Sequence, residues 1–175
     1  MLRRRGRGEQ QQSGPSRYQM RQKLVSIGDD YFIQNEQGQR VFKVDGKALR
    51  VRDTLLFEDM QGHELAKIKE KMLRVKDTMD IEHDGKVVAT VKKALIAPLR
   101  ERYTMNIQGG PDLDIQGNLV DHEYRIDRGR ERVAEVSKKW FRVADSYGVE
   151  ITPGEDDVLI LAATAALDMM SSPGR

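Results

Sequence analysis

The sequence contains no cysteine, so disulfide bonds and thiolate metal sites are excluded. Its longest strongly apolar run, Val158–Leu167, has about half the length that a bilayer-spanning helix requires. No apolar stretch follows the N-terminal arginines, so we expect neither a secretory signal nor a membrane span. A Walker lysine and a G-x-S-x-G elbow are also missing, and we therefore expect no catalytic residues.

The charges are unevenly distributed along the chain. Residues 1–23 hold seven Lys or Arg and one Glu, which leaves 23 basic and 27 acidic residues, a net charge of −4, beyond them. Residues 1–17 are mainly Arg, Gly, Gln and Ser, and we expect a disordered basic tail because they offer little to bury. Residues 18–171 are expected to form a single domain, followed by a disordered end at 172–175.

An octet with the pattern Lys-x-apolar-x-apolar-x-Asp-Thr recurs along the chain. Clear copies begin at Lys47, Lys71 and Lys139, and looser copies begin at Lys23, Lys93 and Gly117. The spacing of these copies indicates six repeats of about 23 residues.

Each repeat predicts two strands and a turn, because apolar and polar residues alternate on either side of a Gly-containing segment. The strands are expected near residues 19–24, 30–35, 40–45, 54–58, 64–70, 78–82, 87–92, 102–108, 113–117, 122–127, 132–139 and 147–151. Six successive hairpins form a meander, and a meander of this length removes its edges by closing on itself. We therefore predict a mainly β fold, a twelve-stranded antiparallel barrel.

A helix is expected near residues 155–170. Thr152–Glu155 fits a capping box, with Pro153 at the first helical position. The segment that follows is apolar on nearly every face, so it should be surrounded by protein. A twelve-stranded barrel is too wide for its own side chains to fill, and we predict that the helix is its core. Close packing would use small residues, namely Ala66, Ala89, Ala134, Ala162, Ala163, Ala165 and Ala166.

Five separated segments match the pattern of a known family in order. They are Leu56–Gly62, Leu119–Tyr124, Val133–Phe141, Asp145–Ile151 and Glu155–Ala162. Over residues 18–170 the chain therefore resembles the LURP-one-related family. That family is similar to the tubby carboxy-terminal domain and the phospholipid scramblases, whose fold is a twelve-stranded antiparallel barrel around a central hydrophobic helix. The resemblance thus implies the architecture that the repeats predict independently.

Several polar residues have a structural interpretation. His63, His83 and His122 lack ligand spacing and are predicted to be solvated turn residues, so we expect no metal and no cofactor. The octet aspartates Asp53, Asp77 and Asp145 precede Thr or Ser at strand boundaries, where they would cap turns. Trp140 is expected in the core beside Ala134 and Val136.

The basic residues of the octets are the candidate ligand-binding site. Equivalent positions of successive hairpins lie at the same end of a barrel, where they would form a cationic rim that attracts phosphate groups. The rim residues are Lys47, Arg50, Lys71, Arg74, Lys93, Arg100, Lys139 and Arg142. The alternative is a set of solvated edge charges neutralised by the octet aspartates, and we favour it because the domain is net acidic.

Two functions are open. The first is a non-enzymatic binding module for anionic phospholipid or another phosphorylated ligand, with Arg3, Arg4, Arg5 and Arg7 each adding about 1 kcal/mol near an acidic membrane. Tubby relatives bind phosphoinositides, whereas the calcium chemistry of scramblases is not expected, because no Asp-x-Asp-x-Asp loop occurs. The second is a protein or nucleic-acid adaptor that uses this tail, although no aromatic residue precedes Tyr18 to stack on bases. We expect a cytoplasmic monomer, attached peripherally to the membrane under the first hypothesis.

Overall fold

The computed structural model describes residues 14–21, 30–46, 54–71, 78–94, 102–141 and 143–171. Within these ranges the chain forms twelve strands, one 3-10 helix and one α-helix. They are β1 (Ser16–Arg21), β2 (Tyr31–Asn35), β3 (Arg40–Asp45), β4 (Thr54–Asp59), β5 (Glu64–Glu70), β6 (Thr78–His83), β7 (Lys86–Lys93), β8 (Arg102–Ile107), β9 (Leu113–Asn118), β10 (Glu123–Arg128), β11 (Glu131–Ser137), η1 (Lys138–Trp140), β12 (Ser146–Ile151) and α3 (Asp157–Ser171).

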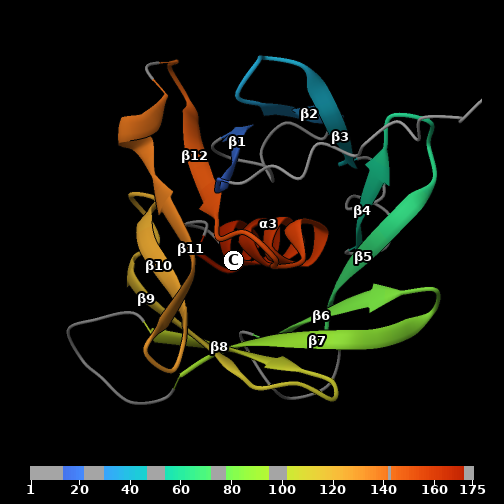
Figure 1. Ribbon diagram of the computed structural model, residues 1–175. Coiled ribbons are helices and arrows are strands. Elements are labelled where there is room, and N and C mark those ends of the chain that lie inside the picture. Colours follow the sequence, from blue (N-terminus) through green and yellow to red (C-terminus); the bar gives the residue numbers. More distant parts are fainter. Residues whose placement is uncertain are drawn as a thin grey trace, which may run out of the picture.

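The twelve strands form one closed antiparallel barrel (Figure 1). Each strand pairs with its neighbours in sequence, and β1 also pairs with β12, so that Ser16 lies opposite Ile151 and Arg21 opposite Ser146. Closure satisfies the backbone groups that an open sheet would leave unpaired at its edges. The predicted barrel is therefore confirmed.

The interior of the barrel is apolar because side chains alternate between its two faces. In β6, for example, Met79 and Ile81 are buried, whereas Asp80 and Glu82 lie on the outer face and are partly exposed. Similar pairs from the other strands build one continuous core.

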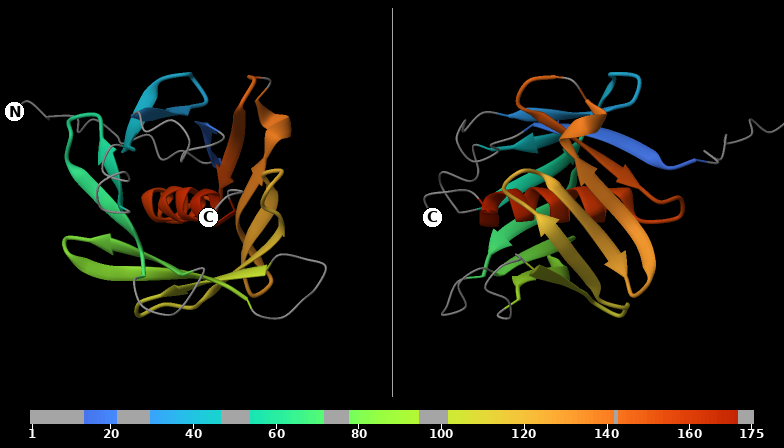
Figure 2. Two further views of the ribbon diagram at one scale, coloured as in Figure 1. Left: turned by 180° about the vertical axis from the view of Figure 1, so that it is seen from behind. Right: turned by 90° about the vertical axis from the view of Figure 1, so that its left-hand side faces the viewer.

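Helix α3 lies inside the barrel and completes this core (Figures 1 and 2). All ten residues from Ile160 to Met169 are buried. The strand residues Ala66, Ala89 and Ala134 are at most 3% exposed, which agrees with the small contacts predicted around the helix. The apolar segment therefore fills the space that the strand side chains leave.

The barrel has two different ends. At the turn end, tight turns join each even-numbered strand to the next strand, and they use glycines with positive φ, such as Gly38 and Gly85. At the loop end, other segments join each odd-numbered strand to the next, and all but the four-residue connection between β9 and β10 are longer than these turns. β12 runs from the loop end to the turn end and α3 returns, so the helix finishes at the loop end (right-hand view of Figure 2).

The helix start differs from the prediction. Asp156 caps the helix, because its Oδ1 accepts a hydrogen bond of 3.0 Å from the backbone N of Leu159. Thr152 instead continues the sheet, where its hydroxyl donates to the backbone oxygen of Arg132 at 2.8 Å. The capping-box interpretation was therefore wrong, although the helix itself was predicted within two residues.

Two strands differ from their predicted bounds by more than one residue. β1 begins at Ser16, three residues before the expected strand and within the predicted tail. β11 ends at Ser137, whose hydroxyl accepts a hydrogen bond of 3.1 Å from the backbone N of Lys139 and begins η1. The division into tail, domain and C-terminal end otherwise stays a prediction.

Candidate functional site

Three lysines of the predicted rim fall within the described residues, and all three belong to the loop end. Lys71 follows β5, Lys93 ends β7 and Lys139 lies in η1 after β11, and each is exposed. The remaining rim residues and the tail arginines lie outside the described residues, namely Lys47, Arg50, Arg74, Arg100, Arg142, Arg3, Arg4, Arg5 and Arg7. Their role in binding stays a prediction.

The sequence separates charge between the two ends of the barrel. The six segments that join odd-numbered strands to the next strand contain eleven Lys or Arg and seven Asp or Glu, a net charge of +4. The five turns and the segment between β12 and α3 contain one Arg and five Asp or Glu, a net charge of −4. By sequence, the connections at the loop end are therefore net basic and those at the turn end net acidic, and eight of the eleven basic residues lie outside the described residues.

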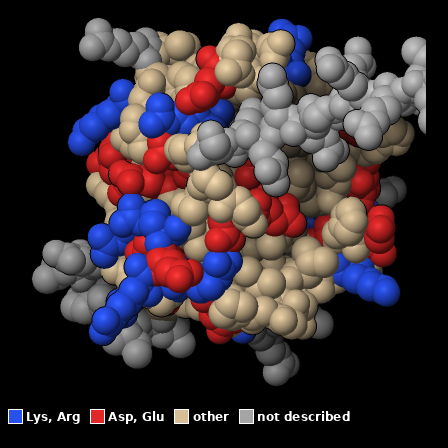
Figure 3. Space-filling model, viewed as in Figure 1, with Lys and Arg blue, Asp and Glu red and all other residues tan. Residues whose placement is uncertain are grey.

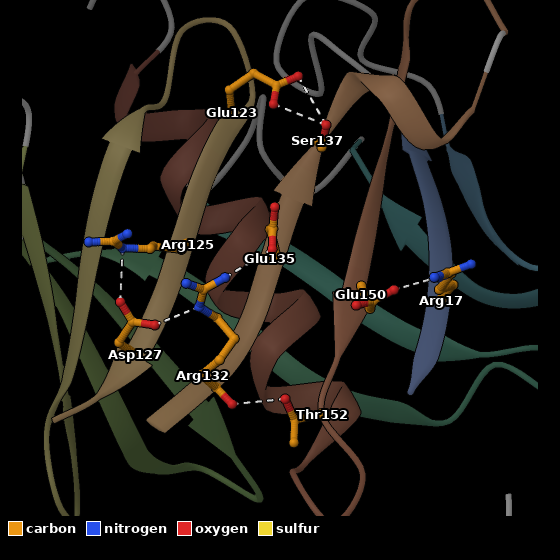
Figure 4. Close-up of polar contacts among 9 residues, drawn as sticks. All are labelled: Arg17, Glu123, Arg125, Asp127, Arg132, Glu135, Ser137, Glu150 and Thr152. Atoms are coloured by element: carbon orange, nitrogen blue, oxygen red, sulfur yellow. Dashed lines mark hydrogen bonds and ion pairs between the residues drawn. The ribbon is translucent and has the colours of Figure 1, made fainter. Parts of the chain in front are cut away.

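The outer face of the barrel pairs its charges. Figure 3 shows Lys and Arg interleaved with Asp and Glu where Figure 1 places β10 and β11. Arg132 Nε lies 2.7 Å from Asp127 Oδ1, and Arg125 Nε lies 3.1 Å from Asp127 Oδ2 (Figure 4). Arg132 Nη1 also lies 2.9 Å from Glu135 Oε2. These cations are neutralised locally and are poor candidates for an anionic ligand.

A buried polar cluster lies beneath the loop end. Asp168, in the last part of α3, accepts a hydrogen bond from the hydroxyl of Tyr147, and its Oδ1 lies 3.0 Å from His122 Nε2. The rings of His122 and Tyr147 stack with their centroids 4.2 Å apart. His122 has a positive φ of 53° in the connection between β9 and β10, which turns its side chain inward. The prediction of a solvated turn residue was therefore wrong for His122.

The other two histidines are exposed, as predicted. His63 Nδ1 lies 2.8 Å from Asp59 Oδ2 in the turn between β4 and β5. His83 Nδ1 lies 2.7 Å from the backbone oxygen of Leu65. In the described part of the chain, no three His, Asp or Glu side chains gather closely enough to hold a metal ion.

Burial controls the protonation of the cluster. It raises the pKa of the Asp168 carboxyl, while the hydrogen bonds from His122 and Tyr147 and the His122 charge oppose that rise. Burial also raises the pKa of Tyr31, Tyr124 and Tyr147, and the nearby Asp168 charge adds to the effect. The tyrosine hydroxyls therefore stay protonated, which suits them to donate hydrogen bonds and not to attack a substrate.

A threonine and a serine near the cluster donate their hydroxyl hydrogens to backbone oxygens. Thr164 donates to the backbone oxygen of Ile160 at 2.9 Å, and Ser146 donates to that of Val143 at 2.8 Å. The cluster thus links α3, β12 and the connection between β9 and β10 through Asp168.

Trp140 lies outside the barrel, contrary to the prediction. β11 ends before it, and η1 carries Trp140 and Phe141 over Gly148 of β12. A Cβ built on Gly148 would lie 2.8 Å from Phe141 Cε2 and 3.0 Å from Trp140 Cε3. Tyr147 and Val149 on either side of Gly148 face the core, so the two aromatic rings cover the outer face and remain half-buried.

The octet aspartates are only partly described. Asp53 and Asp77 lie outside the described residues, whereas Asp145 is exposed and has a positive φ of 59°. The residue after each aspartate begins a strand, as predicted, and these three residues are buried: Thr54, Thr78 and Ser146. No described helix is long and apolar enough to cross a bilayer.

Comparisons with known proteins agree with this architecture. The family model described as LURP-one-related matches residues 16–168. An uncharacterised protein of Bacillus subtilis (strain 168), YxjI, is 30% identical over 151 residues, which cover 86% of this chain and 91% of that protein. The X-ray structure of a protein from Arabidopsis thaliana superposes with a TM-score of 0.68 and 17% identity, covering 90% of this chain and 92% of the other. This last likeness supports the fold alone.

Proposed function

The chain belongs to the LURP-one-related family, and from this premise we propose that it is a non-enzymatic module whose loop end binds the head groups of an anionic membrane. The separation of charge between the two barrel ends carries the proposal. An anionic surface attracts the end with a net charge of +4 and repels the end with a net charge of −4, so it would orient the barrel as well as hold it.

The described lysines support this assignment. Lys43 and Lys69 on the strands lie within 3.5 Å of acidic side chains. Lys71 and Lys139 are exposed at the loop end, and neither forms an ion pair with any described residue. Lys43 and Lys69 are therefore neutralised locally, whereas Lys71 and Lys139 remain available to phosphate groups. Two of the three aspartates expected to neutralise the rim, Asp53 and Asp77, lie outside the described residues.

Vesicle sedimentation with charge-reversed variants tests the proposal. The double variant Lys71→Glu, Lys139→Glu should bind vesicles of equimolar phosphatidylcholine and phosphatidylserine at least about tenfold more weakly than the wild type, because each cation near an acidic surface contributes about 1 kcal/mol. The control is Lys86→Glu, Arg130→Glu, which makes the same charge change at two exposed turn-end positions. Equal losses in the two variants, or wild-type binding that ignores salt and lipid charge, would disprove the proposal.

The tail is tested separately. Ser16, the first residue of β1, pairs with Ile151 at the turn end, opposite the proposed binding face. Deleting residues 1–13 should therefore leave most of the vesicle affinity intact. An adaptor that binds through Arg3, Arg4, Arg5 and Arg7 would instead lose its affinity for single-stranded nucleic acid on the same deletion.

A further inference from the structure

Large apolar side chains are exposed at four positions among the described residues. Val143 and Val120 are the most exposed, at 57% and 54%, and both belong to the loop end. Met60 and Val87 are less exposed, at 42% and 37%, and belong to the turn end. The two most exposed apolar side chains thus lie at the same end as Lys71 and Lys139.

The two valines are carried by connections that are tied together. Glu123, at the start of β10, accepts hydrogen bonds from the hydroxyl of Ser137 at 3.0 Å and the backbone N of Lys138 at 3.1 Å. From the same connection, His122 reaches across to stack on Tyr147 of β12. These contacts join the segment that holds Val120 to the one that holds Val143. Val120 and Val143 therefore lie on two connections that are held together by hydrogen bonds and ring stacking.

The surroundings of the valines combine an indole ring with cations. Trp140 is half-buried on Gly148, and Lys138 and Lys139 immediately precede it. Tryptophan favours the border between head groups and acyl chains, and lysine stems can lie along apolar surface while the ammonium stays in water.

Acidic side chains border this surface and limit its charge. Asp121 and Asp145 are exposed in the same two connections, and Asp121 Oδ2 accepts a hydrogen bond of 2.6 Å from Asn118 Nδ2. By sequence, residues 119–122 and 138–145 hold three basic and two acidic residues, a net charge of +1. Attraction to lipid from this part of the rim is therefore weak, and burial of apolar surface would have to add to it.

We infer that Val120 and Val143 enter the acyl-chain border of an anionic membrane, with Trp140 at head-group level and the lysines contacting phosphate. The inference rests on the proposed function and adds the depth and the orientation of binding. Apolar insertion contributes free energy that salt does not screen, so the complex would withstand ionic strengths that dissociate a purely electrostatic one.

The sole tryptophan makes the inference directly measurable. Wild-type fluorescence is recorded with vesicles of equimolar phosphatidylcholine and phosphatidylserine, with and without bromine on the acyl chains. Brominated chains should quench Trp140 and shift its emission to shorter wavelength. The variant Val120→Ser, Val143→Ser keeps the charge and should bind these vesicles about tenfold more weakly, because it removes apolar area that becomes buried. The turn-end variant Met60→Ser, Val87→Ser is the matched control and should bind like the wild type.

The results separate this inference from the proposed function. If the wild type binds anionic vesicles but Trp140 is not quenched and the valine variant binds normally, insertion is disproved and head-group binding stands. In that case the exposed valines would be assigned to contact with a protein partner instead of lipid. If the wild type does not bind anionic vesicles at all, both proposals fail. Equal weakening by the two serine variants would also overturn the assignment of the loop end.

Discussion

His122 Nε2 lies 3.0 Å from Asp168 Oδ1, and both side chains are buried at the loop end of the barrel. The contact joins the connection between β9 and β10 to the last part of α3, and Tyr147 adds a second link from β12. The rim proposed to meet the membrane is therefore fastened to the helix that fills the barrel. Changes to this pair should alter both stability and the geometry of the rim.

The stability of the wild type should fall relative to Asp168→Asn as the pH rises above about 4. Burial raises the pKa of Asp168, so the folded state binds the proton more tightly than the unfolded state. The stabilisation is fully present below the ordinary carboxyl pKa of 3.8 and is lost as the pH rises through the higher pKa of the folded protein. Urea unfolding of both proteins at a series of pH values measures the difference. If the free energy of unfolding of the wild type instead rises relative to that of the variant with increasing pH, the effect of His122 on the pKa of Asp168 outweighs that of burial.

The energies of His122 and Asp168 should not be additive. His122→Asn tolerates the positive φ but removes a partner from a buried carboxyl group, and should cost about 3 kcal/mol. Combined with Asp168→Asn in a double-mutant cycle, it should reveal a coupling of roughly 1 to 3 kcal/mol. The control His63→Asn touches an exposed ion pair and should leave the free energy of unfolding nearly unchanged. Additive losses would mean that the two residues act separately.

Gly117→Ala should destabilise the barrel by about 3 kcal/mol or more, because it combines backbone strain with a clash. Gly117 has a φ of 139°, and a Cβ there would lie 2.5 Å from the backbone oxygen of Glu123. Gly38→Ala is the control: its φ is also positive, but its Cβ would meet nothing within 4 Å, so only the strain of about 1 kcal/mol remains. Thermal unfolding compares the two, and similar losses would contradict the clash.

Ala163→Leu should cost about 1 to 3 kcal/mol through overpacking. Ala163 is fully buried in the part of α3 that the strands surround. Ala144→Leu adds the same carbon atoms at an exposed loop position and should change little. A melting temperature that is the same for Ala163→Leu and the wild type would argue against an enclosed helix.

Much of the fold could be predicted because its signals are local and repeated. Alternation such as Met79, Asp80, Ile81 and Glu82 reports which side of a strand is buried, and the glycine turns recur at nearly equal intervals. Repetition then implied a meander, and the apolar segment implied something to fill it. The types of the elements followed from these patterns. The N-cap of α3 did not, because either Thr152 or Asp156 could have accepted a hydrogen bond from the first turn, and the chain geometry favours Asp156.

The polar cluster could not be predicted because its signal is not local. His122 stands between Asp121 and Glu123, a context typical of an exposed turn, and only its positive φ turns it inward. Its partner Asp168 follows an apolar run and resembles the polar end of a helix. Trp140 was misplaced for a related reason, because Ser137 ends β11 one turn before it. That Lys71, Lys93 and Lys139 share one end of the barrel could be predicted, because equivalent positions of a repeat lie at the same end; their role in binding stays a prediction.

Pairing of β1 with β12 also sets the order in which the protein can form. Gln19 Nε2 donates to Ser146 Oγ across a separation of 127 residues, so the ring cannot close until nearly all of the chain has left the ribosome. Helix α3 is made later still. Hairpins that are synthesised earlier would expose their apolar faces until β12 and α3 are available. Contacts between residues so distant in sequence also form slowly. Synthesis of this protein therefore carries an aggregation risk that lasts until α3 has been made.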